Sequence, residues 1–373
     1  MDTAHIAKRG DVHPAACTLS PRAVSRAQSL DHCEQTVSPT RPTMKTALDI
    51  ILESRVWDNQ GCMPLRPHDT RFLPQLARCR AAGLDHISLN VGFGDDGIEQ
   101  HLRMIASFRH GLAERATYYT MVRTVDDIES ARNSGKLAVS FDIEGANAVA
   151  DQISLVQLYC DLGVRWMLLA YNSNSADAGG CQDDDCGLTD FGRRLIDEMT
   201  RVGMVVCRSH LGSLSAQEVL DYAPGPVIFS HSIPSAVRPH PRNVSDALMR
   251  ACSAKGGVVG INGVGPFLGD NDTRSETFVR HVDYAVQLIG PQHVALGLGH
   301  VVDQAEVDAG MAAMKGLFPP ELAYDKGMNF VQPEQLEAIV DGLLRLVYAE
   351  GDLRSILNGN LTRIARQVWK EPA

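Results

Sequence analysis

Three residues that could bind a metal ion each follow a short apolar segment of the chain. Glu144 ends the segment Ser140-Phe-Asp-Ile-Glu, and His210 and His231 each follow a serine at the ends of two further apolar segments. A neutral imidazole and a carboxylate are ligand types that zinc prefers. Together the three residues predict a zinc site, although each alone is also typical of a helix cap, a surface acid or a structural histidine.

Two other regions carry reactive side chains. The segment near residue 56 continues into Asp58-Asn-Gln-Gly-Cys62, and the Cys62 thiolate is a further candidate zinc ligand. His300 and Asp303 follow the last apolar segment, at a position where barrel enzymes often keep an acid or a base. The sequence contains no Gly-x-Ser-x-Gly motif, so it gives no support to a serine hydrolase.

The segments that must position these residues alternate between two patterns. Short apolar runs occur at 54–57, 86–91, 137–143, 165–170, 204–207, 227–230, 257–261 and 294–298. Helical patterns lie between them, at 98–113, 125–133, 191–202, 215–222, 245–254 and 275–289. Runs that are apolar on both faces are typical of a buried parallel sheet. About eight β/α units over roughly 250 residues predict a (β/α)8 barrel, with a doubly wound sheet as the alternative.

In a barrel, functional groups lie at the carboxyl ends of the strands, which is where Glu144, His210 and His231 are expected. By contrast, His101, His110 and the region of His281 lie in helical patterns. These histidines are expected on the surface.

The composition limits the class of protein. The chain has 373 residues, of which 44% are hydrophobic and 21% are charged, close to the average of globular proteins. The net charge of -10 argues against a nucleic-acid partner. No apolar run approaches the roughly 18–20 residues of a membrane span, and the first residues lack the apolar core of a secretory signal. We therefore expect a cytoplasmic protein, whose nine cysteines are reduced.

The first 43 residues differ from the rest of the chain. They are rich in Pro, Ser, Thr, His and Arg and show no apolar periodicity. This pattern predicts a disordered extension over 1–43 and a single barrel domain over 44–373. Translation could begin at Met1 or at Met44.

The order of six motifs resembles the renal (membrane) dipeptidase family of zinc metallopeptidases. The resemblance covers most of 46–369. No single motif is decisive, but six in this order are specific. They are Gly187-Leu-Thr-Asp-Phe-Gly192, Gly203-Met-Val-Val-Cys-Arg-Ser-His210, Pro226-Val-Ile-Phe-Ser-His231, Pro241-Arg-Asn-Val-Ser-Asp246, Lys255-Gly-Gly-Val-Val-Gly260 and Asn358-Gly-Asn-Leu-Thr-Arg363.

The resemblance implies a (β/α)8 barrel that binds two zinc ions and hydrolyses dipeptides. It places Glu144 where a carboxylate bridges the two ions, and His210 and His231 on the second ion. It assigns Arg242 to the substrate carboxylate, which a guanidinium can bind in a bidentate manner. It also implies a homodimer, for which no feature of the sequence locates an interface.

Four positions depart from the family pattern. The family's Asp-x-His-x-Asp motif, which holds the first zinc ion, reads Asp58-Asn-Gln60-Gly-Cys62 here. Tyr171 stands in place of a substrate-side histidine, and Gly299 in place of a catalytic aspartate. The second zinc position is therefore complete and the first is altered. We expect one or two zinc ions per chain and name no catalytic acid or base.

Three functions remain as hypotheses. The first is hydrolysis of a dipeptide, or of a related small amide with a carboxylate, by a zinc-bound water. The second is a barrel that has lost this activity and acts as a binding protein, and the third is a non-peptide amidohydrolase. We favour the first, because Arg242 and the second zinc position are retained. Its zinc ligands would be Glu144, His210, His231 and Cys62, and its substrate-binding residues Arg242 and Tyr171.

Overall fold

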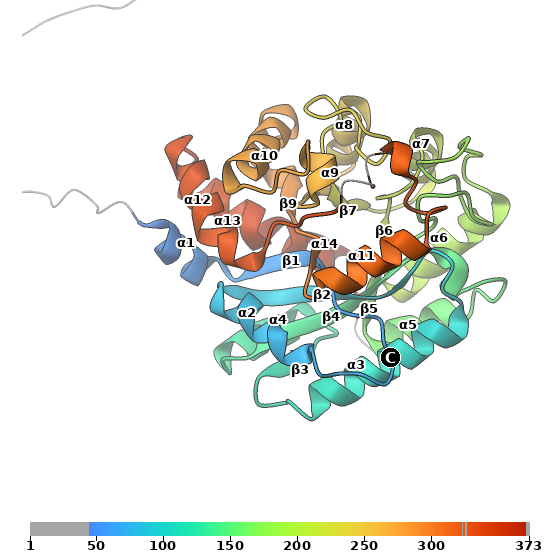
Figure 1. Ribbon diagram of the computed structural model, residues 1–373, viewed down its shortest axis with the longest axis horizontal. Coiled ribbons are helices and arrows are strands. Elements are labelled where there is room, and N and C mark those ends of the chain that lie inside the picture. The colour runs from blue at the N-terminus through green and yellow to red at the C-terminus, as the bar shows by residue number, and fades with distance from the viewer. Residues whose placement is uncertain (1–44, 323, 325–326, 371–373) are drawn as a thin grey trace, which may run out of the picture. The chain divides into compact units, whose positions relative to one another are not determined.

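The structure is a computed structural model that describes residues 45–322, 324 and 327–370 (Figure 1). The predicted extension over 1–43 lies outside the described residues, so that prediction and the domain boundary at residue 44 stay predictions. Within the described part of the chain, no helix is both long and apolar enough to cross a membrane. The cysteines of this part are free thiols.

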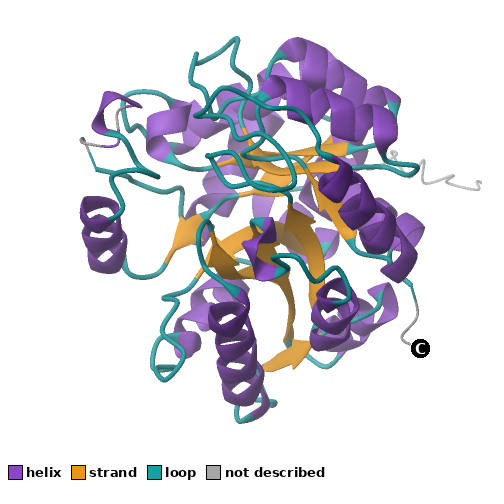
Figure 2. Cartoon of the chain, turned by 90° about the vertical axis from the view of Figure 1, so that its right-hand side faces the viewer, coloured by secondary structure: helices purple, strands orange, loops and turns teal. Residues whose placement is uncertain are grey.

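Eight parallel strands form the centre of the described chain (Figure 2). They are β1 (Val56–Cys62), β2 (Leu84–Phe93), β4 (Leu137–Glu144), β5 (Val164–Leu168), β6 (Val205–Cys207), β7 (Ile228–Ser232), β8 (Val258–Asn262) and β9 (Val294–Gly297). They pair in this order, and β9 pairs again with β1, where Asp58 lies against Leu296. The sheet is therefore closed, which confirms the (β/α)8 barrel and excludes the open doubly wound sheet.

Two short strands extend this sheet. β3 (Tyr119–Met121) pairs with β4, and β10 (His300–Val301) pairs with the end of β1. The sequence did not predict either strand. β10 matters for the site because it fixes the chain that follows Gly299 beside Gly61 and Cys62.

Helices cover the outside of the barrel (Figure 1). They are α1 (Ala47–Ser54), α2 (Leu76–Ala81), α3 (Ile98–Ala113), α4 (Val125–Asn133), α5 (Leu155–Leu162), α6 (Asp190–Val202), α7 (Ser213–Tyr222), α8 (Asp246–Ala254), α9 (Gly265–Leu268), α10 (Ser275–Ile289), α11 (Gln304–Ala313), α12 (Leu336–Arg345), α13 (Glu350–Arg354) and α14 (Asn360–Val368). Several begin at side-chain caps: Thr46 and Thr124 form capping boxes, and Thr189 and Ser245 accept from the first turn. The predicted helices 98–113, 125–133 and 275–289 agree with α3, α4 and α10.

The interior of the barrel is filled from one end. Trp57 and Trp166 belong to a buried cluster that also contains Leu361 and Ile364 of α14. Asn360, at the start of α14, donates to the carbonyl of Val294 at the start of β9. The last helix therefore closes the amino-terminal end of the barrel, and the carboxyl ends of the strands remain for the site.

Two of the three histidines expected on the surface are buried, so that prediction was wrong for them. His101 and His281 are about 1% exposed or less, whereas His110 is exposed as predicted. His101 Nδ1 contacts the Gly97 carbonyl and His281 Nε2 contacts the Leu268 carbonyl, both at 2.9 Å. A helical pattern does not reveal such partners. Burial lowers the pKa of His281 to about 4, so this histidine is neutral in the core.

Candidate functional site

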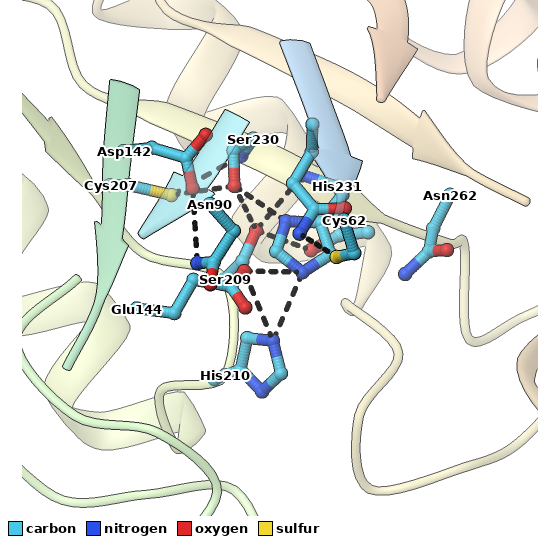
Figure 3. A network of polar contacts seen from close by, with 12 residues as sticks. Cys62, Asn90, Asp142, Glu144, Cys207, Ser209, His210, Ser230, His231 and Asn262 are labelled. Atoms are coloured by element: carbon cyan, nitrogen blue, oxygen red, sulfur yellow. Dashed lines mark hydrogen bonds and ion pairs between the residues drawn. The ribbon is translucent and has the colours of Figure 1, made fainter. Parts of the chain in front are cut away.

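The carboxyl ends of β4, β6 and β7 bring three predicted metal ligands together (Figure 3). Nε2 of His231 lies 3.0 Å from Oε1 of Glu144, and Nε2 of His210 lies 3.8 Å from the same oxygen. The two Nε2 atoms are 3.0 Å apart. Among the described residues, these three form a group whose ligand atoms all lie within 4.8 Å of one another. Their role as zinc ligands stays a prediction, but the side chains have the required types and proximity.

Hydrogen bonds at Nδ1 favour the same tautomer of both imidazoles. His210 Nδ1 lies 2.7 Å from Oδ1 of Asn172, an oxygen that can only accept, so Nδ1 carries the proton. His231 Nδ1 lies 2.7 Å from Oγ of Ser230, whose hydroxyl donates to Ser209 and can therefore accept from Nδ1–H. Each Nε2 is consequently left with its lone pair. Such outer partners are typical of metal-binding histidines.

Burial favours the neutral form of these imidazoles. It lowers the pKa of His231 below its ordinary value and that of His210 well below it, and Arg242 adds to both shifts. Oε1 of Glu144 is buried and has no hydrogen-bond partner in the described structure. In this tautomer, two nitrogen lone pairs and a carboxylate oxygen face one another. A cation is the natural partner for such a set, so the residues fit the zinc ion that the family implies.

Tyr171 forms one wall beside this group. Its ring stacks on His210 at a centroid distance of 4.1 Å and packs against Phe93 at 5.2 Å. Burial, and then the charge of Glu144, raise the pKa of Tyr171 well above its ordinary value. The phenol therefore stays protonated and can donate a hydrogen bond.

Strained backbone supports the same group. Asn172 and His210 both have positive φ, at 60° and 67°. Asn tolerates this conformation better than most residues, whereas it is uncommon for others and concentrates at functional sites. The two strained residues are hydrogen-bonded to each other through their side chains.

The region that would hold a first zinc ion is different. Nε2 of Gln60 donates to Sγ of Cys62 at 3.2 Å, and Gly299 has a φ of 64° and no side chain. Burial, then Glu144 and Asp142, raise the pKa of Cys62 well above its ordinary value, so its thiol is neutral. Cys62 lies outside the group of mutually close ligand atoms. Its role as a ligand stays a prediction, and the residues present do not fit a second ion of the family type.

The carboxylate of Asp58 is held away from this region. Its Oδ1 accepts from the backbone N–H of Leu298 at 2.8 Å, and its Oδ2 lies 3.2 Å from Nδ1 of His300. Nε2 of His300 lies 3.5 Å from Sγ of Cys79 on α2. His300, expected beside the site as an acid or base, is buried in this cluster and does not line the cavity.

Arg242 lies behind His231. Its Nη2 donates to the His231 carbonyl at 2.8 Å and its Nη1 donates to Oγ of Ser232 at 3.3 Å. Its Nε has no partner in the described chain. Its guanidinium carbon also lies 5.8 Å from the ring centroid of Phe267, which lines the cavity. Arg242 itself is 3% exposed and is not a lining residue. A buried guanidinium with only neutral acceptors is unusual, since buried charges are normally paired.

A cavity of about 360 Å³ opens beside Glu144, His210 and His231. Much of its wall is apolar and comes from loops and from α11. Lining residues that make it apolar include Leu65, Phe267, Met311, Met314, Phe318 and Phe330. Asp303 and Glu306 line its α11 side, where both pair with Arg66. The cavity is therefore suited to a small molecule with an apolar part.

Three polar residues of the site were missed from the sequence. Asn172 and Ser230 orient the histidines, and Asn262 lines the cavity from the end of β8. Asn262 ends a strand as the predicted ligands do, but its amide does not ionise and so does not point to a metal site. Asn172 follows Tyr171 in a loop and offers no comparable signal.

Residues 70–315 match the membrane dipeptidase family (peptidase family M19). The chain therefore belongs to this family, and the resemblance inferred from the six motifs is confirmed. An uncharacterised dipeptidase of Schizosaccharomyces pombe is 33% identical over 182 residues, which are 46% of this chain and 43% of that protein. Dipeptidase 3 of Macaca fascicularis is 27% identical over 260 residues, which are 68% of this chain and 49% of that protein. The chain thus spans less than half the length of these curated relatives.

Solved structures show the same fold. An amidohydrolase from Pseudomonas aeruginosa superposes with a TM-score of 0.78 at 24% identity, covering 88% of this chain and 100% of that one. A metallopeptidase from Rhodobacter sphaeroides, liganded with a phosphinate mimic of the dipeptide L-Ala-D-Ala, gives 0.70 at 19% identity, covering 84% and 99%. At these identities the likeness concerns the fold alone.

Proposed function

We propose that this chain is a zinc-dependent hydrolase of a dipeptide, or of a related small amide that carries a carboxylate. One zinc ion would be held by Glu144, His210 and His231. When bound, zinc supplies Lewis acidity for attack on an amide carbonyl. The observation that carries the proposal is the group of two Nε2 lone pairs and one unpartnered carboxylate oxygen, all buried at the carboxyl end of the barrel.

Arg242 would bind the carboxylate of the substrate. Its guanidinium is buried, has a free Nε and is bonded only to neutral oxygens. A carboxylate would supply the missing negative charge in a bidentate geometry that suits arginine. The ligand in the Rhodobacter sphaeroides structure, a mimic of a dipeptide, is a molecule of this class.

The other residues of the chain would orient the substrate and hold protons. The protonated Oη of Tyr171 would donate to the carbonyl oxygen of the bound amide. Asn172 and Ser230 would keep both imidazoles in the tautomer with Nδ1 protonated. The apolar wall around Met311 and Phe330 would exclude water from the bound amide.

Elemental analysis tests the proposal first. Protein purified without chelator and then supplied with zinc should contain about one zinc per chain, and Cys62→Ser should retain it. His210→Ala should lose the ion, whereas His110→Ala, which changes an exposed histidine, should not. The zinc-loaded protein should hydrolyse members of a panel of dipeptides and N-acyl amino acids, and Arg242→Gln should raise KM more than it lowers kcat.

The other outcomes point elsewhere. About two zinc ions per chain would overturn the single-ion site and show that Gln60 and Cys62 take part in a second one. No zinc after addition would overturn the proposal and favour a binding protein. Zinc without hydrolysis of any member of the panel, but with cleavage of lactams or carbamates, would favour the non-peptide amidohydrolase.

A further inference from the structure

Two buried side-chain amides line the cavity where the family has a zinc ion. Gln60, on β1, is 2% exposed, and Asn262, at the end of β8, is 1% exposed. Both belong to the cavity wall. Neither residue takes part in the group formed by Glu144, His210 and His231.

Each amide is fixed by one partner and leaves one atom free. Gln60 uses its Nε2 to donate to Sγ of Cys62 at 3.2 Å, and its Oε1 has no partner. Asn262 uses its Oδ1 to accept from the backbone N–H of Val264 at 2.8 Å, and its Nδ2 has no partner. Figure 3 shows the side-chain nitrogen of Asn262 on the side that faces Cys62. The two side chains therefore leave one buried acceptor and one buried donor without a partner among the described residues.

Both amides lie beside Gly299. A Cβ atom at Gly299 would lie 3.0 Å from Oε1 of Gln60 and 3.4 Å from Oδ1 of Asn262. An added Cβ would therefore be in tight contact, so the amide oxygens of both residues lie directly beside Gly299. Buried polar atoms rarely lack a partner in native proteins, and a free donor and acceptor beside one cavity indicate a ligand that completes them.

We propose that Gln60 and Asn262 bind a neutral amide of the substrate in its cis arrangement. Oε1 of Gln60 accepts from the amide N–H, and Nδ2 of Asn262 donates to the amide carbonyl oxygen. A lactam or a primary carboxamide presents both groups on one edge, whereas a trans peptide bond presents them on opposite edges. The proposal rests on the proposed function only in taking this cavity as the substrate cavity.

The surroundings favour such a group. Gln60, Asn262 and Gly299 have no ionisable side chain, so this part of the wall supplies no counter-charge. A charged amine or carboxylate would lose its hydration here without gaining a counter-charge. The apolar side chains across the cavity, such as Met311 and Phe330, accommodate the ring or chain that carries the amide.

Three matched probes test the subsite. ε-Caprolactam has a cis N–H and carbonyl, N-methyl-ε-caprolactam lacks the N–H, and ε-caprolactone replaces it by an ester oxygen. With the zinc-supplied full chain, ligand-observed NMR should show that caprolactam binds about 10-fold or more tightly than the other two, since each analogue leaves a buried group unpaired. Gln60→Met should reduce this preference to about 2-fold or less, whereas Asn262→Asp should weaken the binding of all three probes, because all three carry the carbonyl group. The exposed control Gln287→Met should change neither the preference nor the affinity.

The variants separate the subsite from the stability of the fold. Asn262→Asp retains the oxygen that accepts from Val264 and replaces the Nδ2 donor by a second carboxyl oxygen. If Gln60→Met does not fold, as judged by circular dichroism, the affinity of Asn262→Asp for caprolactam decides the outcome. Equal binding of the three probes, no binding of any, an unchanged preference in folded Gln60→Met or an unchanged caprolactam affinity in folded Asn262→Asp would overturn the proposal.

Zinc content, measured on the same samples, separates this proposal from the proposed function. A chain that binds no zinc but still prefers caprolactam would keep the amide subsite and overturn the zinc-dependent hydrolase. A chain that binds zinc and hydrolyses dipeptides, but shows no preference among the probes, would overturn the subsite alone.

Discussion

The two halves of the cavity floor differ in charge. On the side of β4, β6 and β7, Glu144, His210 and His231 gather three electron-pair donors around one point. On the side of β1, β8 and β9, the corresponding positions hold amides, a neutral thiol and a glycine. One half is therefore suited to a cation and the other to a neutral polar group.

The half of the cavity floor formed by β1, β8 and β9, here called the neutral half, has a carboxylate nearby that does not face the cavity. Asp58 of β1 remains, but its carboxylate is directed to the Leu298 N–H and to His300 rather than to the cavity. The Asp58 carboxylate is therefore a structural group, because its partner is His300 of the neighbouring strand β10. The presence of an acidic residue alone does not make a metal site.

The largest expected effect concerns the half of the cavity floor that is suited to a cation. Glu144→Gln removes the single carboxylate of the group and should weaken zinc binding by more than about 100-fold, because residues that only support a ligand already cost about 10–100-fold. Competition with a chromophoric chelator measures this affinity. Glu99→Gln, which changes an exposed carboxylate of α3, is the matched control and should bind zinc as before. Equal affinity in the Glu144 and Glu99 variants would mean that the ion binds elsewhere.

A smaller effect is expected at the residue that orients His210. Asn172→Gly adopts the positive φ of this position freely but removes the acceptor for Nδ1–H, so zinc affinity should fall about 10–100-fold. Asn172→Asp keeps the acceptor and should stay within a few-fold of the natural chain. If the glycine variant keeps its affinity while the aspartate variant loses it, the hydrogen bond to Asn172 is not what orients His210.

The fold could be predicted from the sequence because the barrel repeats one pattern. Runs such as 137–143 are apolar on both faces, and α3 and α4 were located to the residue. The first strand was predicted, but with the wrong bounds: it was expected at 54–57 and runs over Val56–Cys62. Its polar second half, Asp58 to Gln60, is buried because it serves the site and the pair with His300, which an apolar pattern does not reveal. α11 was missed because none of its residues is buried.

The site was only partly predictable for a related reason. Glu144, His210 and His231 were found because each ends a strand and ionises. The free atoms of Gln60 and Asn262 depend on the closure of the barrel, which brings β1 and β8 to either side of Gly299. Such a relation among three distant segments is set by tertiary structure and leaves no local signal.

The buried pair of Asp58 and His300 should make the free energy of unfolding depend on pH. Burial lowers the pKa of His300, but the Cys79 sulfur and the Asp58 carboxylate outweigh burial and raise it to about 10. Because an unfolded histidine titrates near 6.5, this stabilisation is complete below about pH 6.5 and is lost as the pH rises toward 10. The difference in the free energy of unfolding between the natural chain and His300→Gln should therefore shrink by about 1.4 kcal/mol per pH unit. Urea unfolding at pH 7, 8 and 9 measures it, and a constant difference would show that His300 is neutral in the fold.

The smallest expected effect concerns Gly299, which lies beside the two amides. Gly299→Ala places a methyl group at a φ of 64° and 3.0 Å from Oε1 of Gln60, so it should destabilise the fold by about 1 kcal/mol in urea unfolding. Gly225→Ala, where a Cβ meets nothing within 4 Å, is the control and should cost less. The same methyl group would occupy the volume that a bound amide needs, so caprolactam binding should fall in the Gly299 variant while zinc affinity stays unchanged. If zinc affinity falls as well, zinc binding in one half of the cavity floor is coupled to amide binding in the other.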